Sequence, residues 1–378
     1  MKHEQKKHGS NSEILERIKF EYSSLLQGKP LSLQNLFAPE NFSFSDFCKE
    51  FRPYPKSEQL IQTAEEFGHQ YGVWQINAKH YINCASLLYP QAEPERLLTI
   101  MKNLTLGFFL NDVMGRDMFK FLSVDKQQEY AGMIHSMANL DENLNISLEP
   151  HDIELANVIV LKEFRDNSPE KWFLKFKRLY SHHIEITHQD CNTDSQGHIP
   201  DVYEYMEGRC HLAGMNHIVL WVEYSNGQFL DWELLKLAKL SQKMERLHWL
   251  SAAFGALSND LFSFEKEVID CSSDSNLVAI VLLNDYSLSL KDAIDKASEI
   301  VRNLVMELVA LLNILKSEIE NLNSENPALA SQLNVHLNGL VRFIQASWLW
   351  QLHAKRYKRG KSIWVETTLP KEVVTRPI

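Results

Sequence analysis

The sequence predicts an all-α protein, and three observations support this prediction. Glycine and proline are scarce, with 14 and 12 residues among 378, whereas turn-rich β folds need many of both. From Ser57 onward, apolar residues recur at the spacing of a helix face that is buried against a core. No long segment alternates apolar and polar residues as a half-buried strand would.

The expected elements follow in chain order. Residues 1 to about 12 are polar, and Ile14 to Leu25 indicate a short leading helix. The stretch 29–56 contains several prolines and is expected to be irregular and to lie on the helical body. Further helices are expected from Ser57, from Pro94, and over 125–139, 149–166, 168–189, 200–224, 231–267, 287–321 and 327–357. The expected divisions are a tail and irregular segment (1–56), a single helical domain (57–357) and a C-terminal tail (358–378).

Two segments need separate interpretation. Residues 190–197 are polar and end in Gly197, which predicts a loop. The apolar run from Asn276 to Leu283 is compatible with a buried strand or a buried helix, because short apolar runs do not distinguish the two. The helical pattern on both sides favours a buried helix.

Composition excludes several classes of protein. A formal net charge of -10 argues against a general nucleic-acid binder. The five cysteines are scattered and form no CxxC pair, so neither zinc nor a disulfide framework is expected, whereas a cytoplasmic location is expected. No apolar leader and no run of about 18 apolar residues is visible, so neither a secretory signal nor a membrane span is expected. The 15 histidines show no metal-binding spacing, and no role is assigned to them.

The stretch Asn259-Asp260-Leu261-Phe262-Ser263-Phe264-Glu265-Lys266-Glu267 carries the strongest chemical signal. Asn259, Ser263 and Glu267 are spaced i, i+4 and i+8, so an α-helix would place them on one face. An amide oxygen, a hydroxyl and a carboxylate suit a hard cation such as Mg²⁺. Lys266 precedes the last of them and is expected to meet an anion that the metal carries. The alternative is a solvated helix face.

These nine residues resemble the NSE metal motif of microbial class I terpene synthases (terpene cyclases), and Asn259, Asp260, Leu261, Ser263 and Glu267 match its fixed positions. The resemblance implies the isoprenoid-synthase helical bundle around a deep apolar cavity, with the terpene synthase α-domain over 57–357. It also implies Mg²⁺ as the cofactor, in a set of three ions.

A second stretch, Phe108 to Asp117, ends an apolar helix with polar and acidic residues, as expected where metal ions sit at the mouth of an apolar cavity. It resembles a degenerate form of the family's aspartate-rich motif, with Asn111-Asp112 where two aspartates are usual. Asp112 keeps its place in either alignment and is the implied bridging metal ligand. Asn111 and Asp117 are secondary candidates. The alternative is a solvated helix end.

Two more segments imply a diphosphate site. Tyr203 to Gly214 resembles the family segment that holds a diphosphate-sensing arginine followed by a helix break, which places Arg209 in that role and the break near Ala213 and Gly214. The guanidinium fork suits phosphate oxygens. Arg356 and Tyr357 resemble the Arg-Tyr pair that closes microbial terpene synthases. The alternatives are an ordinary salt-bridged arginine and a basic helix end.

Aromatic side chains are expected to line the cavity and to shield a carbocation with their ring faces. The candidates are Phe108, Trp74 and Trp348. The alternative for each is plain core packing.

The resemblance implies a Mg²⁺-dependent terpene cyclase that ionises a prenyl diphosphate, either farnesyl or geranylgeranyl, and cyclises the cation to a sesquiterpene or diterpene. The reaction would end by loss of a proton or by capture of water. A homodimer is compatible with the family. The alternatives are a non-catalytic helical binding or scaffold protein derived from a cyclase, and a trans-prenyltransferase, which would need a second aspartate-rich motif in place of Asn259 to Glu267.

Overall fold

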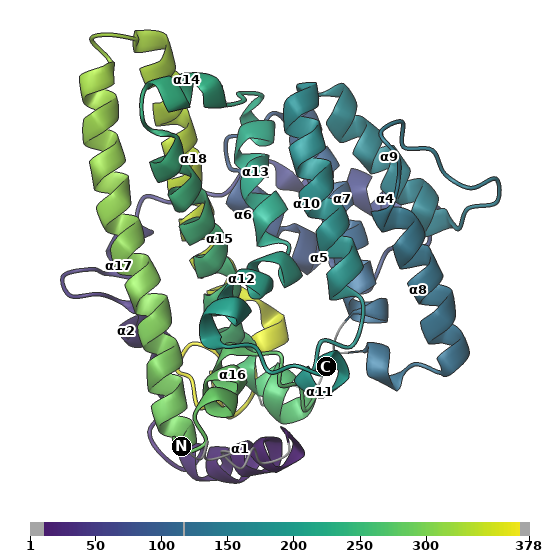
Figure 1. Cartoon of the computed structure of the whole chain (residues 1–378), viewed down its shortest axis with the longest axis vertical. Coiled ribbons are helices and arrows are strands. Elements are labelled where there is room, and N and C mark those ends of the chain that lie inside the picture. Colours follow the sequence, from purple (N-terminus) through teal and green to yellow (C-terminus); the bar gives the residue numbers. More distant parts are fainter. Residues whose placement is uncertain (1–10, 116–117, 371–378) are drawn as a thin grey trace, which may run out of the picture.

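The computed structural model describes residues 11–115 and 118–370, and Figure 1 shows these residues as a bundle of helices. Within them, β-pairing is limited to two isolated bridges. The helices are α1 (Asn11–Leu25), α2 (Leu33–Phe37), α3 (Phe44–Phe47), α4 (Ser57–Gln70), α5 (Ala78–Ile82), α6 (Cys84–Leu88), α7 (Pro94–Met114), η1 (Phe119–Phe121), α8 (Val124–Ala138), α9 (Asp152–Asp166), α10 (Glu170–Thr187), α11 (Thr193–Gln196), α12 (Val202–Leu212), α13 (Met215–Asn226), α14 (Trp232–Leu237), α15 (Ser241–Phe264), η2 (Glu265–Asp270), α16 (Leu277–Asn284), α17 (Leu290–Leu322), α18 (Pro327–His353) and η3 (Lys355–Tyr357).

Helix α15 is the centre of the bundle, because it packs against α12, α13, α16, α17 and α18. Its second half is almost entirely buried. The long helices α17 and α18 run along one side of the molecule, and α8, α9 and α10 form the other side (Figure 1). The all-α prediction is confirmed.

The hydrophobic pattern explains the individual helices. In α17, one apolar stripe that includes Leu290, Ile294 and Val301 is buried along the helix, and a Ser289–Asp292 capping box begins it. In α16 every residue from Leu277 to Leu283 is buried. The ambiguous apolar run is therefore a buried helix, as predicted.

Two expected boundaries differ from the structure, and one expected helix break is confirmed. The segment 190–197 is not only a loop, because it contains the single-turn helix α11. The helical stretch expected over 200–224 is divided into α12 and α13 at Gly214, whose φ of +70° ends the first helix. This division confirms the helix break that the family resemblance implies near Ala213 and Gly214. The stretch expected as one helix over 231–267 consists of α14, α15 and the π-helical turn η2.

The segments flanking the bundle also pack on it. Backbone bridging joins Leu31 to Trp364, whose side chain is fully buried. Glu366 accepts hydrogen bonds from the Ser32 hydroxyl and from the first backbone N–H groups of α2. Residues 358–370, expected as a tail, thus form part of the folded body. No helix among the described residues has the length and apolar character needed to cross a bilayer.

Candidate active site

The end of α15 and the π-helical turn η2 that follows it carry the three metal ligands predicted from the NSE motif, Asn259, Ser263 and Glu267. Asn259 and Glu267 line one cavity. Ser263 is buried between them, and its hydroxyl donates to the Asn259 carbonyl oxygen at 2.7 Å. Glu267 follows the point at which the helix becomes a π-helical turn. The prediction of regular α-helical spacing is therefore wrong for the last ligand, because a π turn bonds residues i and i+5.

Asn276 holds this turn in place and was not found by sequence reasoning. Its fully buried amide nitrogen donates to Glu267 Oε2 at 3.1 Å and to the Asp260 carbonyl oxygen at 2.8 Å. Its oxygen accepts from the Val278 N–H and caps α16. An asparagine directly before an apolar run is the usual signature of such a cap. The cap therefore couples the start of α16 to the orientation of Glu267.

Asp260, at the second motif position, is fully buried and does not line the cavity. Its carboxylate accepts from Arg209 Nε at 2.7 Å, from the Tyr205 hydroxyl at 2.6 Å and from the Leu277 N–H at 2.9 Å. Arg209 is only 4% exposed but still lines the cavity, and its Nη2 lies 3.4 Å from Asn259 Oδ1. The ion pair fixes Arg209 beside the predicted metal ligand.

The C-terminal Arg-Tyr pair reaches the same region from η3. The Tyr357 hydroxyl accepts from Asn259 Nδ2 at 2.7 Å. Arg356 Nη2 lies 3.9 Å from Asp112 Oδ1 at the end of α7, and Asn111 Nδ2 donates to that same oxygen at 3.0 Å. The fold therefore brings α7, α15 and η3 together around one opening.

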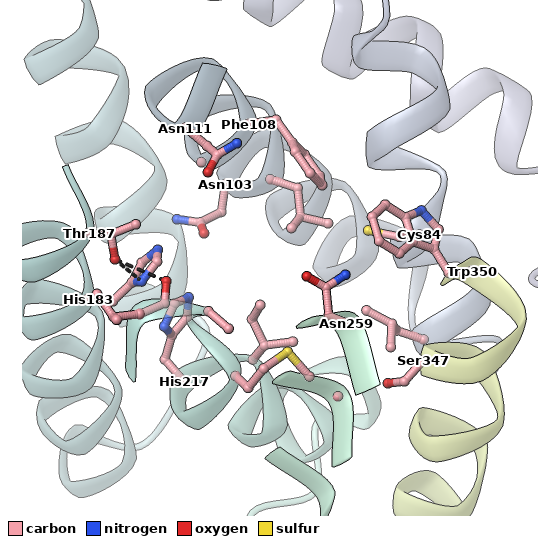
Figure 2. Close-up of a pocket in the computed structure, with 18 of the residues that line it drawn as sticks. Cys84, Asn103, Phe108, Asn111, His183, Thr187, His217, Asn259, Ser347 and Trp350 are labelled. Carbon is pink, nitrogen blue, oxygen red and sulfur yellow. Dashed lines mark hydrogen bonds between the residues drawn. The ribbon is translucent and has the colours of Figure 1, made fainter. Parts of the chain in front are cut away.

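The cavity has a volume of about 230 Å³. Figure 2 shows Phe108 and Asn111 of α7, Asn259 of α15 and Trp350 of α18 facing it from different helices. Apolar residues contribute most of its surface. Its shape and position suit an apolar ligand that carries one polar end.

Two of the three aromatic candidates do not line this cavity. Phe108 does. Trp348 is 2% exposed and packs in the core, stacked on Phe44 with the ring centroids 4.3 Å apart. Trp74 is packed against Gly68 of α4. Helical spacing did not reveal that Trp350, two residues after Trp348, and Trp221 are the tryptophans that line the cavity.

Three other candidates have different positions. Lys266 is half-buried and does not line the cavity. Asp112 is not a lining residue, although its neighbour Asn111 is. Asp117 lies outside the described residues.

The donor set fits a hard cation. Asn259, Ser263, Glu267 and Asp112 offer only oxygen ligands, which Mg²⁺ prefers. The Ser263 hydroxyl gives its single hydrogen to the Asn259 carbonyl oxygen, so its lone pairs are still able to ligate a metal. Asn259 and Glu267 face the same cavity, so the chemistry of the set and the placement of these two residues agree with the predicted metal.

Comparison with known proteins also points to terpene synthases. The chain is 25% identical to sesquiterpene synthase 1 of Postia placenta over 194 residues, which are 51% of this chain and 54% of that protein. It is 21% identical to sesquiterpene synthase Agr1 of Cyclocybe aegerita over 305 residues, 76% of this chain and 78% of that protein. The chain thus spans about half the length of the first of these curated relatives.

The fold is shared with solved structures. That of an a-eudesmol synthase superposes with a TM-score of 0.64 at 17% identity, covering 81% of this chain and 97% of that one. A linalool/nerolidol synthase from Streptomyces clavuligerus gives 0.64 at 13% identity, covering 80% and 97%. The family model "Terpene synthase family 2, C-terminal metal binding" matches residues 102–307, more than half of the chain. The chain therefore belongs to the class I terpene synthases, in terpene synthase family 2.

Proposed function

We propose that this protein is a Mg²⁺-dependent terpene cyclase that ionises a linear prenyl diphosphate and closes the resulting carbocation into a ring. The observation that carries the proposal is the meeting of Asn259, Glu267, Arg209, Arg356 and Tyr357 on one cavity whose remaining lining is mainly apolar. Such a cavity offers oxygen ligands and cationic donors at one end and space for a hydrocarbon at the other. A scaffold protein would have no need for this combination.

The metal would be held by Asn259, Ser263 and Glu267 on one side and by Asp112, with Asn111 beside it, on the other. Bound Mg²⁺ would supply charge neutralisation for the departing diphosphate. The orientation of these ligands depends on Asn276, through its bond to Glu267, and on Tyr357, through its bond to Asn259.

Arg356, Arg209 and Tyr357 would bind the diphosphate oxygens. Arg356 faces Asp112 at 3.9 Å, so an arriving diphosphate would exchange one anionic partner of the guanidinium for another. Arg209 is held by Asp260, which reduces the side-chain entropy lost when it meets the anion. Together these donors stabilise the charge that develops as the allylic C–O bond breaks.

Phe108 and Trp350 contribute aromatic rings to the cavity lining, where they would stabilise cationic intermediates and exclude water. We propose farnesyl diphosphate as the first substrate to test, since the curated relatives named above are sesquiterpene synthases. All five cysteines are free thiols, as suits the cytosol, where we propose that the enzyme works.

The test is incubation of purified protein with prenyl diphosphates of ten, fifteen and twenty carbons, with Mg²⁺ or with EDTA. Diphosphate release is assayed, and the extract is analysed by gas chromatography and mass spectrometry. The expected result is a cyclic terpene from one substrate that forms only with the metal. A folded protein that releases no diphosphate from any of the three would refute the proposal.

Asn259→Ala and Glu267→Ala are expected to lower turnover by at least about 100-fold with the fold intact, because each removes a metal ligand. Matched controls are Asn321→Ala and Glu320→Ala, which change the same residue types at exposed positions of α17. The controls are expected to keep wild-type turnover. Wild-type turnover in either motif variant would contradict the metal assignment.

A further inference from the structure

One wall of the cavity is lined by imidazoles, which is unexpected where a hydrocarbon is to bind. His183 and His188, from α10 and the residue after it, and His217 of α13 all line it. His188 and His217 are buried, and His183 is half-buried. The rings of His183 and His217 lie 5.1 Å apart. Figure 2 shows both on one side of the cavity, across from Ser347 and Trp350. Buried polar groups of this kind require an explanation.

The hydrogen bonds of His183 fix its tautomer. Nδ1 lies 2.9 Å from the His211 carbonyl oxygen, which only accepts, so Nδ1 carries the hydrogen. The Thr187 hydroxyl, also 2.9 Å from Nδ1, donates its own hydrogen to the Leu212 carbonyl oxygen. The lone pair of the neutral ring is therefore on Nε2.

The position of Nε2 is set by the break between α12 and α13. A Cβ atom placed on Gly214 would lie 3.3 Å from His183 Nε2 and 2.8 Å from His217 Cε1. Glycine at this point therefore leaves room beside the lone pair. Its chain neighbours Ala213 and Met215 line the cavity, so the lone pair lies at the cavity wall.

Burial keeps the ring uncharged at neutral pH. Burial is the largest cause that lowers the pKa of His183 to about 4, together with neighbouring His211, His182 and Arg209, while the bond to the His211 carbonyl oxygen acts in the opposite direction. Burial also lowers the pKa of His217 well below its ordinary value. The wall therefore presents neutral bases rather than cations, which would repel a carbocation.

We propose that His183, through Nε2, is the base that accepts the proton lost in the last step of the cyclisation. This deepens the proposed function and rests on it. The C–H bond next to the cationic carbon breaks, its electron pair forms the new C=C bond, and the proton bonds to Nε2. The imidazolium keeps its Nδ1–H on the His211 carbonyl oxygen and releases the new proton to water when the cavity opens.

A weak base is sufficient for this step, because a carbocation is a far stronger acid than an imidazolium. A base of ordinary strength would be partly protonated at neutral pH and would then be unable to accept the proton. The proposal predicts an olefin as the main product rather than an alcohol.

The test is His183→Asn. The asparagine amide can still donate to the His211 carbonyl oxygen from the place of Nδ1, but it has no group in place of Nε2. Diphosphate release is expected to stay within about threefold of wild type, since the proposed proton transfer follows ionisation. The main olefin is expected to fall about tenfold or more as a share of products, with alcohols or differently placed alkenes replacing it.

The matched control is His336→Asn. His336 is a buried imidazole whose pKa is lowered by burial to about 3, and it is hydrogen-bonded to His248 and is not part of the cavity. The product profile of this variant is expected to match wild type.

The results of these experiments distinguish failure of the proposed role of His183 from failure of the proposed cyclase function. Normal diphosphate release from His183→Asn with an unchanged product profile would overturn the role of His183 and leave the cyclase proposal standing. Absence of diphosphate release from the folded wild-type protein would overturn the cyclase proposal itself. If His183→Asn does not fold, His183→Phe keeps the ring volume without the lone pair, and the same change in products is expected of it.

Discussion

Removing the carboxylate of Asp260 tests whether the second motif residue holds Arg209 rather than a metal. This carboxylate is fully buried and accepts hydrogen bonds from three groups: the Arg209 guanidinium, the Tyr205 hydroxyl and the Leu277 N–H. Asp260→Ala would remove the carboxylate that Arg209 Nε meets, while the guanidinium, 4% exposed, would stay buried. Breaking a buried ion pair in this way costs about 3–5 kcal/mol. We therefore expect the free energy of unfolding to fall by about 4 kcal/mol.

The assay is equilibrium urea unfolding followed by circular dichroism, with reversibility checked for each variant. Tyr205→Phe removes one hydrogen bond and is expected to cost about 1 kcal/mol. The double variant Asp260→Ala/Arg209→Met removes both charges, so it is expected to be more stable than Asp260→Ala alone. A loss below about 1 kcal/mol in Asp260→Ala, or strictly additive effects in the double variant, would refute the reasoning.

Two further predictions concern the cavity wall and the core. Gly214→Ala is expected to lower the free energy of unfolding by about 1–3 kcal/mol, because φ is +70° and the new Cβ meets His217. Gly208→Ala, with open space around the new Cβ, is the control. Equal losses for the two variants in urea unfolding would contradict the predicted strain at Gly214. Burial raises the pKa of Glu223 to about 7 from an ordinary 4.5, so the folded state binds more protons than the unfolded state between these values and stability falls as the pH rises through them. The difference in unfolding free energy between Glu223→Gln and wild type is therefore expected to be about 2–3 kcal/mol more favourable to the variant at pH 8 than at pH 5. A difference that does not change with pH would contradict this.

The helices that the sequence predicts most clearly are those whose own pattern of apolar residues shows which of their side chains are buried. The apolar stripe of α17 and the uniformly apolar run of α16 are local properties, and both are helices in the structure. The division of 200–224 at Gly214 was expected from the family resemblance and not from the hydrophobic pattern, because a single glycine inside a helical pattern is often tolerated.

The residue types of the site were predictable from the sequence, but the local backbone conformation and the hydrogen bonds that orient these residues were not. Asn259 and Glu267 both line the cavity, yet the π-helical turn that contains Glu267 has no simple sequence signature. The bond network of Asp260 joins residues more than 50 positions apart, which spacing alone does not reveal. One signal was present: Tyr205 and Arg209 are spaced i and i+4, so they share one helix face, and that face meets Asp260.

The histidines show the same limit. His183, His188 and His217 have no metal-binding spacing, and their common feature is a cavity formed by helices that are distant in sequence. Only the packing of α10 against α13 places the rings together.

The packed segments at either end of the bundle affect where this domain can be divided. Glu265, within the π-helical turn, accepts hydrogen bonds from the Tyr22 hydroxyl, the Ser362 hydroxyl and the Ile363 N–H. These partners lie well outside residues 102–307, the part of the chain that the family model matches. A fragment limited to that region would lack these three hydrogen-bond donors to Glu265. The buried carboxylate of Glu265 would be exposed, and the turn that orients Glu267, two residues later, would lose its support. The folded domain is therefore longer than the region that the family model matches.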